Sequence, residues 1–226
     1  MNLKKRVKAV VFDLGGVLAI SKFPLRLIED THLVGVPSHC GHRSIGVHEY
    51  LANKLKIVLD QWFDAIDTIY AKSIEGKVSE KKVLSIISKN LNISPKKLEK
   101  LIIKAYRANF IQNKELYNFT FKLRKNGYKT AILSDQWPPS KKALVLKKYT
   151  KKFNKVIVSC DVGMRKPNPK IYRLLLKKLN LPAKQVVYID NQEWNLVPAR
   201  KLHIHAILFK NNEQLFKELK KLGVAI

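Results

Sequence analysis

Residues 7–20 of the chain read VKAVVFDLGGVLAI, an apolar run that one aspartate interrupts and two glycines follow. Short apolar runs rich in valine and bounded by glycine are typical of buried strands. The pattern therefore predicts a buried strand that delivers Asp13 to a glycine-rich turn. An aspartate after a strand is often only a turn residue, so the rest of the chain decides whether this one is functional.

Four more short apolar runs share this strand-like character, and helical patterns separate them from residue 113 onward. Strands that alternate with helices predict an α/β fold with a parallel sheet and helices on both faces. In such sheets ligands bind at the carboxyl ends of the strands. The five predicted strands are 8–14, 128–135, 155–160, 186–190 and 204–209.

The first two predicted strands are separated by a long segment with several helix patterns and no clear strand. Ser79 and Ser94 are expected to be helix N-caps, the latter with Pro95 at the first helical position. We therefore predict a helical cap that is inserted beside the carboxyl end of the first strand and roofs the site. The predicted boundaries are 1–16 and 113–226 for the core and 17–112 for the cap.

Composition limits the class of protein. The 226 residues are 46% hydrophobic, which is enough for a packed core. No stretch approaches the roughly 20 apolar residues of a membrane-spanning helix, and the start of the chain does not resemble a signal peptide. Cys40 and Cys160 are too few for a disulfide framework. We therefore expect a cytoplasmic protein that has no membrane partner.

The charge is unusual, because 44 Lys and Arg against 17 Asp and Glu give a formal net charge of +27. Such a charge would attract nucleic acid, anionic membranes or phosphorylated small molecules. The lysines are spread along helical patterns and form no arginine-rich block with interleaved aromatic residues. This spread favours lysines that merely solvate helix faces, and nucleic acid stays possible as a partner.

Polar side chains follow each of the first four predicted strands. Because the carboxyl ends of parallel strands meet at one edge of a sheet, these side chains should converge. A carboxylate can act as a covalent nucleophile, a lysine can balance phosphate charge, and Mg²⁺ prefers hard oxygen ligands. The set therefore suits phosphoryl transfer. Its members are Asp13, Ser134, Asp135, Lys166, Asp190 and Asn191.

These residues lie in four segments, FDLGGVL, ILSD, RKPNPKIY and YIDNQEWNLVPARKLHIHAI. In order and spacing they resemble motifs I to IV of the haloacid dehalogenase-like (HAD) hydrolases, over essentially the whole chain. The insertion resembles the type-1 cap of that family. The form of motif I is similar to the branch that holds glucose-1-phosphatase-like proteins and the N-terminal domains of epoxide hydrolases. The resemblance implies a Rossmann-like core and a Mg²⁺-dependent phosphatase.

The resemblance also implies roles for residues near the phosphate. Asp13 would attack phosphorus and form an aspartyl-phosphate that water then hydrolyses. Ser134 would hydrogen-bond the phosphoryl group, with Asp135 beside it in the phosphate site. Lys166 would offset the charge between Asp13 and the phosphate. The substrate would be a small phosphorylated metabolite.

A magnesium site is implied in the same way. Asp13 and Asp190 would bind the ion, and the backbone carbonyl of Gly15 would provide a further ligand. Asn191 would support the metal through a water molecule. Because Asn191 replaces an acid of the family and is neutral, Mg²⁺ should bind less tightly than in most relatives.

The most important departure from the family pattern is Gly15, which stands where most family phosphatases have a second aspartate. That residue protonates the leaving group, and general acid catalysis typically supplies about 10²–10⁴-fold. We therefore expect a substrate with a good leaving group, such as an anomeric sugar phosphate or an acyl phosphate. The alternative is a catalytically weak or inactive HAD-fold protein with a binding or regulatory role, associated with nucleic acid through its charge.

Two further departures are Asp135, where asparagine is usual, and His203, where glycine is usual. A carboxylate near phosphate repels it unless the side chain turns away, for example to cap a helix. In the segment 38–48, one cysteine and irregular spacing argue against a zinc site. Instead, His42, Arg43 or His48 are candidates for substrate contact or for donating the missing proton.

Overall fold

The computed structural model describes residues 7–22 and 45–224 and contains a five-stranded parallel sheet in the order β5-β4-β1-β6-β7. Strand β1 lies at its centre, so its carboxyl end is flanked by the ends of β4 and β6. This confirms the predicted α/β class and all five predicted strands, each within a few residues. Their bounds are β1 Ala9–Phe12, β4 Lys129–Ser134, β5 Lys155–Val158, β6 Val186–Asp190 and β7 His205–Leu208.

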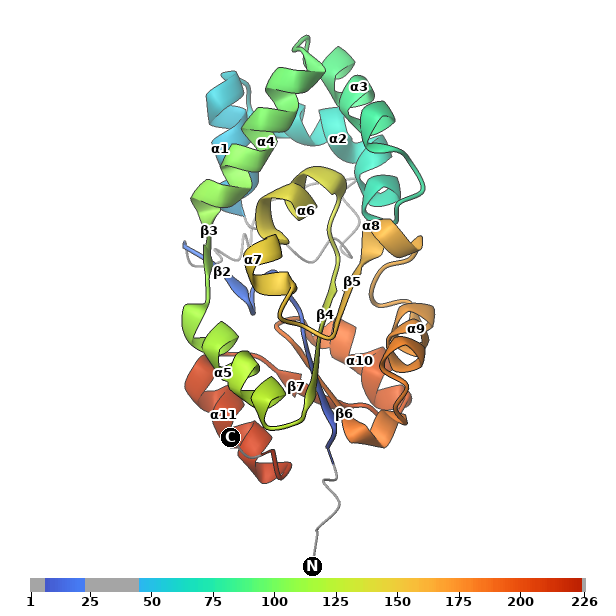
Figure 1. Ribbon diagram of the computed structural model, residues 1–226. Coiled ribbons are helices and arrows are strands. Elements are labelled where there is room, and N and C mark those ends of the chain that lie inside the picture. The colour runs from blue at the N-terminus through green and yellow to red at the C-terminus, as the bar shows by residue number, and fades with distance from the viewer. Residues whose placement is uncertain (1–6, 23–44, 225–226) are drawn as a thin grey trace, which may run out of the picture.

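Helices cover both faces of the sheet, as the unbroken apolar strands require (Figure 1). Alternate residues of β1 separate the two faces: Val10 and Phe12 join one hydrophobic cluster, and Ala9 and Val11 the other. The first cluster includes residues of α5 and α11, and the second includes residues of α9 and α10. The bounds are α5 Lys114–Lys125, α9 Pro169–Leu179, α10 Glu193–Lys201 and α11 Asn212–Lys221, with a short 3-10 turn, η1, at Ala183–Gln185.

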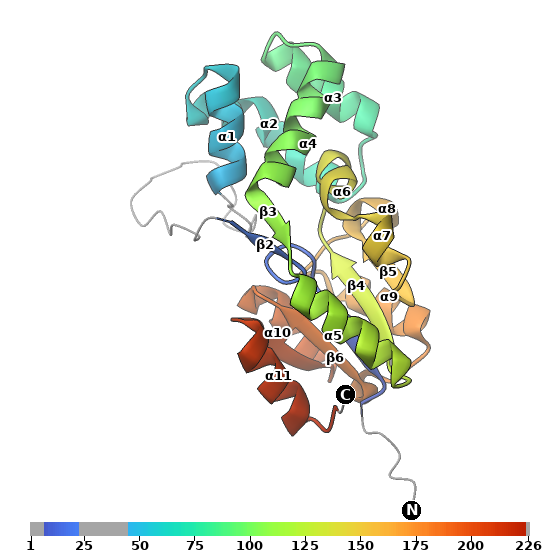
Figure 2. The same ribbon diagram turned by 60° about the vertical axis from the view of Figure 1, so that its left-hand side comes forward.

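Four helices form a cap above the carboxyl ends of the central strands (Figures 1 and 2). Ser79 and Ser94 cap two of them, since each hydroxyl accepts a hydrogen bond from the backbone three residues later. The apolar pattern around residues 51–70 forms two helices, because Lys56 adopts a left-handed φ of 58° between them. The helices are α1 Ile45–Leu55, α2 Leu59–Ile74, α3 Glu80–Asn90 and α4 Pro95–Asn109.

The expectation that residues 17–112 contain no strand is wrong at both ends of the insertion. Strand β2, Ala19–Ser21, pairs antiparallel with β3, Phe110–Gln112, so the two chain connections between core and cap lie side by side. Three-residue strands carry almost no periodic signal, and their partners are about ninety residues apart in the chain. The domain boundaries expected beside these strands stay a prediction.

The cap also packs on a small helical unit of the core, formed by α6 Pro138–Leu144, α7 Lys147–Thr150 and α8 Ser159–Val162. Trp137, just before α6, donates its indole N–H to the hydroxyl of Tyr106 in the cap, at 3.0 Å. Gly76 lies so close to the carbonyl of Cys160 that a Cβ there would come within 2.2 Å of the oxygen. These contacts fix the cap over the strand ends. Within the described residues no helix is long and apolar enough to cross a membrane.

Candidate active site

Asp13 follows β1 directly and is almost fully buried, with 1% of its surface exposed. Its backbone N–H donates to the carbonyl of Ile189 in β6, which fixes the turn against the neighbouring strand. Its Oδ1 accepts a hydrogen bond from the Leu14 backbone at 2.7 Å and lies 3.0 Å from Nζ of Lys166. A carboxylate held in this way by a backbone donor and a cation stays in one orientation.

Lys166 lies between two carboxylates at the centre of the site. Its Nζ is 3.0 Å from Oδ1 of Asp13 and 2.8 Å from Oδ2 of Asp190, and the residue is 3% exposed. Burial by itself lowers the pKa of Lys166, but the charges of Asp13, Asp190 and Asp135 outweigh burial and raise it above its usual value. The ammonium is therefore charged throughout the physiological range.

Asp190 ends β6 and is completely buried. Besides Lys166, its Oδ2 accepts hydrogen bonds from the hydroxyl of Tyr188 and the amide of Asn195, and its Oδ1 accepts one from the backbone of Gln192. The predicted role of Asp190 as a metal ligand stays a prediction. Its contacts indicate a further role, which is to hold Lys166 in place.

Tyr188 and Asn195 are parts of the site that sequence reasoning missed. Tyr188 lies in a strand that reads as ordinary buried core, and burial together with Asp190 raises the pKa of its hydroxyl well above the usual value. Asn195 is held by Tyr172, whose hydroxyl donates to its backbone carbonyl at 2.6 Å. The only sequence signal is position, since Tyr188 precedes Asp190 by two residues and therefore shares its face of the strand.

Ser134 ends β4, next to the end of β1, and is 1% exposed. Its Oγ accepts a hydrogen bond at 3.0 Å from the side-chain amide of Gln136. Gln136 is itself held by Ser159, whose Oγ accepts its backbone N–H at 3.0 Å. Because a hydroxyl can donate its proton while its oxygen accepts, this arrangement leaves the Ser134 hydrogen available for a ligand.

Asp135 does not cap helix α6, because the helix begins at Pro138 and the Asp135 carboxyl turns to another loop. Its Oδ1 accepts the backbone N–H of Lys166 at 3.2 Å, which ties the loop after β4 to the loop that carries the lysine. Burial raises the pKa of Asp135 to about 7, although Lys166 and Arg165 act against the rise. Three aspartates thus surround one buried ammonium, and Asp135 is the one that stays partly exposed.

This raised pKa predicts a pH-dependent stability. Between about pH 4 and pH 7, folded protein retains a proton on Asp135 that the unfolded chain has lost, so stability falls as pH rises through this window. We expect Asp135→Asn to remove this dependence of the unfolding free energy on pH. At pH 8 the variant should be more stable than wild type by about 1–3 kcal/mol, a range that is reduced because the side chain is partly exposed. Urea unfolding at pH 5 and pH 8 in EDTA and without phosphate measures it.

The control for this experiment is Asp64→Asn, which removes an exposed carboxylate from the cap. It should leave the difference between pH 5 and pH 8 as it is in wild type. If the unfolding free energies of wild type and Asp135→Asn change equally between pH 5 and pH 8, Asp135 is ionised across this whole pH range.

The two glycines after Asp13 have different surroundings. Apart from its chain neighbours, no atom of the described residues lies within 4 Å of a Cβ built on Gly15, so these residues leave space where the family's second aspartate would project. Gly16 has a φ of +83°, and a Cβ there would lie 2.4–2.7 Å from side-chain atoms of Asn191. The Asn191 amide therefore packs on the Gly16 backbone, and its Oδ1 is buried without a hydrogen-bond partner among the described residues.

The oxygen atoms of Asp13, Gly15 and Asn191 suit weak binding of a hard cation such as Mg²⁺. Within residues 7–22 and 45–224 no group of three or more His, Cys, Asp or Glu side chains is placed to hold a metal ion. What remains is a carboxylate from Asp13, the carbonyl of Gly15 and the orphaned Oδ1 of Asn191. Mg²⁺ commonly uses only one or two carboxylates and completes its shell with water and substrate phosphate.

The sequence predicted that His42, Arg43 or His48 of the cap contacts the substrate or donates a proton. His42 and Arg43 lie outside the described residues. The Nδ1 of His48 accepts the indole N–H of Trp62 at 2.7 Å, and its ring lies 5.1 Å from that of Phe63. His48 is thus part of an aromatic cluster of the cap. His203, which stands where glycine is usual in the family, adopts a left-handed φ of 63°.

Comparison with known proteins agrees with this fold. The sequence profile of the haloacid dehalogenase-like hydrolases matches residues 7–203, and the chain therefore belongs to this family of hydrolases. Bifunctional epoxide hydrolase 2 of Mus musculus is 28% identical over 226 residues, which cover 95% of this chain and 38% of that protein. The similarity agrees with the predicted epoxide hydrolase N-terminal branch.

Solved structures of the same fold come from enzymes with different chemistry. A HAD family enzyme of Bacteroides thetaiotaomicron, in complex with magnesium and inorganic phosphate, has a TM-score of 0.69 and 19% identity, covering 93% of this chain and 99% of its own. L-2-haloacid dehalogenase from Xanthobacter autotrophicus, with chloropropionic acid covalently bound, has a TM-score of 0.55 and 17% identity, covering 97% and 85%. At these identities the likeness establishes the fold alone.

Proposed function

We propose that the protein is a Mg²⁺-dependent phosphatase that hydrolyses a small phosphorylated metabolite through an aspartyl-phosphate at Asp13. The observation that carries this proposal is the placement of Lys166, a buried ammonium between Asp13 and Asp190 at the carboxyl ends of the central strands. A fixed positive charge beside a buried carboxylate suits an incoming anionic group whose charge must be balanced. The magnesium and phosphate complex of the Bacteroides thetaiotaomicron enzyme supports it.

Each residue has a defined part in this proposal. A carboxylate oxygen of Asp13 forms a bond to phosphorus while the bond to the leaving oxygen breaks, and water then attacks phosphorus and frees Asp13. The Ser134 hydroxyl, oriented by Gln136, donates to a phosphoryl oxygen. Lys166 balances the charge of the phosphoryl group, and Asp190 keeps the ammonium in position.

Magnesium would be held by the Asp13 carboxylate, the Gly15 carbonyl and Oδ1 of Asn191. When bound it would neutralise phosphate charge next to the nucleophile. The buried Oδ1 of Asn191, which lacks a hydrogen-bond partner among the described residues, supports this assignment. In this arrangement Asn191 would contact the ion directly, and Asp190 would hold Lys166 in place. A single charged ligand makes the affinity low, so ion and substrate should bind together.

The proposal is tested by phosphate release from a panel of sugar, acyl and nucleotide phosphates, with Mg²⁺ and with EDTA. We expect activity on acyl phosphates and anomeric sugar phosphates, whose leaving groups need little protonation, and its loss in EDTA. Activity on no member of the panel would favour the alternative, a HAD-fold binding protein whose site no longer turns over.

Gly15→Asp is predicted to widen the range of substrates. The described residues leave space for a side chain at this position, which needs no left-handed backbone, so the variant should fold. A carboxyl group there could protonate a poor leaving group, and we expect turnover of simple alkyl phosphates to rise by about 10²-fold. Turnover of acyl phosphates should change little, and the ratio of the two rates is the readout.

The matched control is Gly15→Asn, which fills the same space without an acid. An equal rise in Gly15→Asn, or no rise in Gly15→Asp, would mean that the proton comes from another group or from water.

A further inference from the structure

Basic residues are concentrated in one part of the chain. Of the forty residues from 121 to 160, eleven are Lys or Arg, and Asp135 in the active site is the single acid. Most of these cations are exposed and lie around the edge strand β5. We call the exposed cations of this stretch whose side chains make no ion pair or hydrogen bond among the described residues, together with one arginine of the cap, the β5-edge surface. It consists of Arg107, Lys122, Lys125, Lys147, Lys148, Lys151, Lys152 and Lys155.

The fold brings these residues together from separate elements. The guanidinium of Arg124 donates to the carbonyl of Lys152 at 2.6 Å, which joins the end of α5 to the segment after α7. Tyr149 of α7 stacks on Tyr117 of α5 with ring centroids 4.2 Å apart. Lys155 follows in β5, which among the described strands pairs only with β4. The end of α5, helix α7 and strand β5 therefore present one continuous basic surface.

The cations of the β5-edge surface have no acidic ion-pair partners in the part of the chain that the structure describes. Among the ion pairs of the described residues, none involves a member of the β5-edge surface. Three nearby acids pair with lysines outside this set: Asp161 with Lys141 at 2.6 Å, and Glu80 and Glu99 both with Lys142, at 2.8 and 2.6 Å. Eight exposed cations without counter-charges create a positive potential that attracts polyanions.

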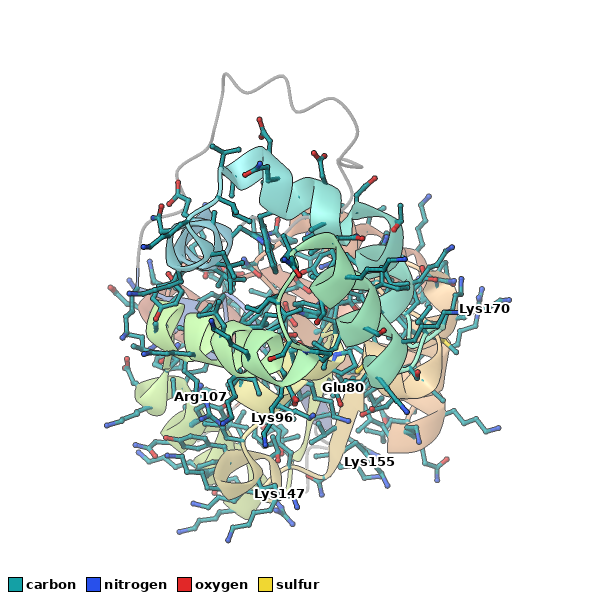
Figure 3. All side chains as sticks on the ribbon, turned by 90° about the horizontal axis from the view of Figure 1, so that it is seen from above. Glu80, Lys96, Arg107, Lys147, Lys155 and Lys170 are labelled. Atoms are coloured by element: carbon teal, nitrogen blue, oxygen red, sulfur yellow. The ribbon has the colours of Figure 1, made fainter. Side chains whose placement is uncertain are left out.

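A groove with an apolar floor begins at one end of the surface. Arg107, Lys147 and Lys148 line it together with Phe110, Leu144 and Leu146. Seen from above, Arg107, Lys147 and Lys155 lie along one side of the molecule, while Lys170 points outward on another (Figure 3). A polyanion that follows the lysines can therefore place an apolar group in the groove.

We propose that the β5-edge surface binds single-stranded nucleic acid, with phosphates along the lysines of α7 and β5 and a base in the groove. Single strands bind where a cationic track adjoins apolar or aromatic side chains that accept an unstacked base. An anionic membrane would use the charges but not the concave groove. The surface is separate from Asp13 and its surroundings, so this proposal is independent of phosphatase activity.

The test is fluorescence anisotropy with a labelled single-stranded RNA 20-mer of mixed sequence, from 50 to 200 mM NaCl. Wild type should bind with a steep salt dependence. The quadruple variant Lys147→Ala, Lys148→Ala, Lys151→Ala and Lys152→Ala should bind at least about 10-fold more weakly at 100 mM salt. The slope of log Kd against log salt should decrease by about 2–3, as expected when four phosphate contacts are lost.

The matched control removes four exposed lysines of α9 and η1, on the face of the sheet away from α5, and has the same net charge. They are Lys170, Lys177, Lys178 and Lys184. It should lose less than about threefold in affinity. Equal losses in the two variants would overturn the proposal and assign binding to net charge alone. Equally strong competition by polyphosphate of matched length, or binding of phosphatidylserine vesicles without binding of RNA, would also overturn it.

Discussion

Asp13→Asn is expected to lower phosphate release from acetyl phosphate by about 10³-fold or more, because the amide cannot form the acyl-phosphate bond. The fold should survive. The oxygen of the introduced amide can still accept the Leu14 backbone hydrogen bond seen in wild type, and the side-chain volume is nearly unchanged. Steady-state kinetics with Mg²⁺, together with thermal unfolding, separate a chemical defect from a folding defect.

The control for Asp13→Asn is Asp161→Asn, the same exchange at a half-exposed aspartate that pairs only with Lys141 among its ion-pair contacts in the described residues. Its activity should equal that of wild type within about twofold. If Asp13→Asn retains wild-type activity, Asp13 is not the nucleophile, and the observed phosphate release belongs to another site or to a contaminant.

Lys166→Met is expected to have the largest effect on stability. Removing the ammonium leaves Asp13 and Asp190 buried with no cation between them, and breaking a buried ion pair in this way typically costs about 3–5 kcal/mol. The loss should be greatest near pH 8 and should shrink toward pH 5, as the carboxylates take up protons. Urea unfolding of wild type and variant at both pH values measures it.

Lys170→Met serves as the matched control, because Lys170 is exposed and lies in the first turn of the helix after the same loop. Its unfolding free energy should change by less than about 0.5 kcal/mol. A loss below about 1 kcal/mol for Lys166→Met at pH 8 would mean that the three aspartates do not depend on the lysine for their burial.

The strands and the helix starts were predictable because their signals are local. An apolar run between glycines defines β1, and serine caps at Ser79 and Ser94 need only the next few residues to act. The convergence of Asp13 and Lys166 was also predictable, since parallel strands bring their carboxyl ends to one edge. These features need the order of the elements and no knowledge of their detailed packing.

The parts that sequence reasoning missed depend on contacts between distant segments. Strands β2 and β3 exist because they meet each other at the entrance to the cap, not because three residues favour a strand. The hydrogen bond between Trp137 and Tyr106 likewise joins segments that only the docked cap brings together. The hydrogen bonds that Tyr188 and Asn195 donate to Asp190 could not be predicted. A tyrosine in a buried strand usually contributes only to core packing.

The clustering of lysines has a similar explanation. Along the sequence they are spread over several elements, which favoured the interpretation that they solvate helix faces. The fold brings α5, α7 and β5 to one edge and leaves the acids elsewhere. A surface of one sign is a property of the assembled elements, so composition alone could not assign it.

In the proposed mechanism, Asp13 carries the phosphoryl group during turnover. The most direct test is a rapid-quench experiment with ³²P-labelled acetyl phosphate and excess enzyme in Mg²⁺, followed by peptide mapping of the denatured protein. Transient label is expected on the peptide that contains Asp13, formed before free phosphate appears and absent from Asp13→Asn. Release of labelled phosphate at the full rate without any protein-bound label, in wild type and Asp13→Asn alike, would contradict this mechanism.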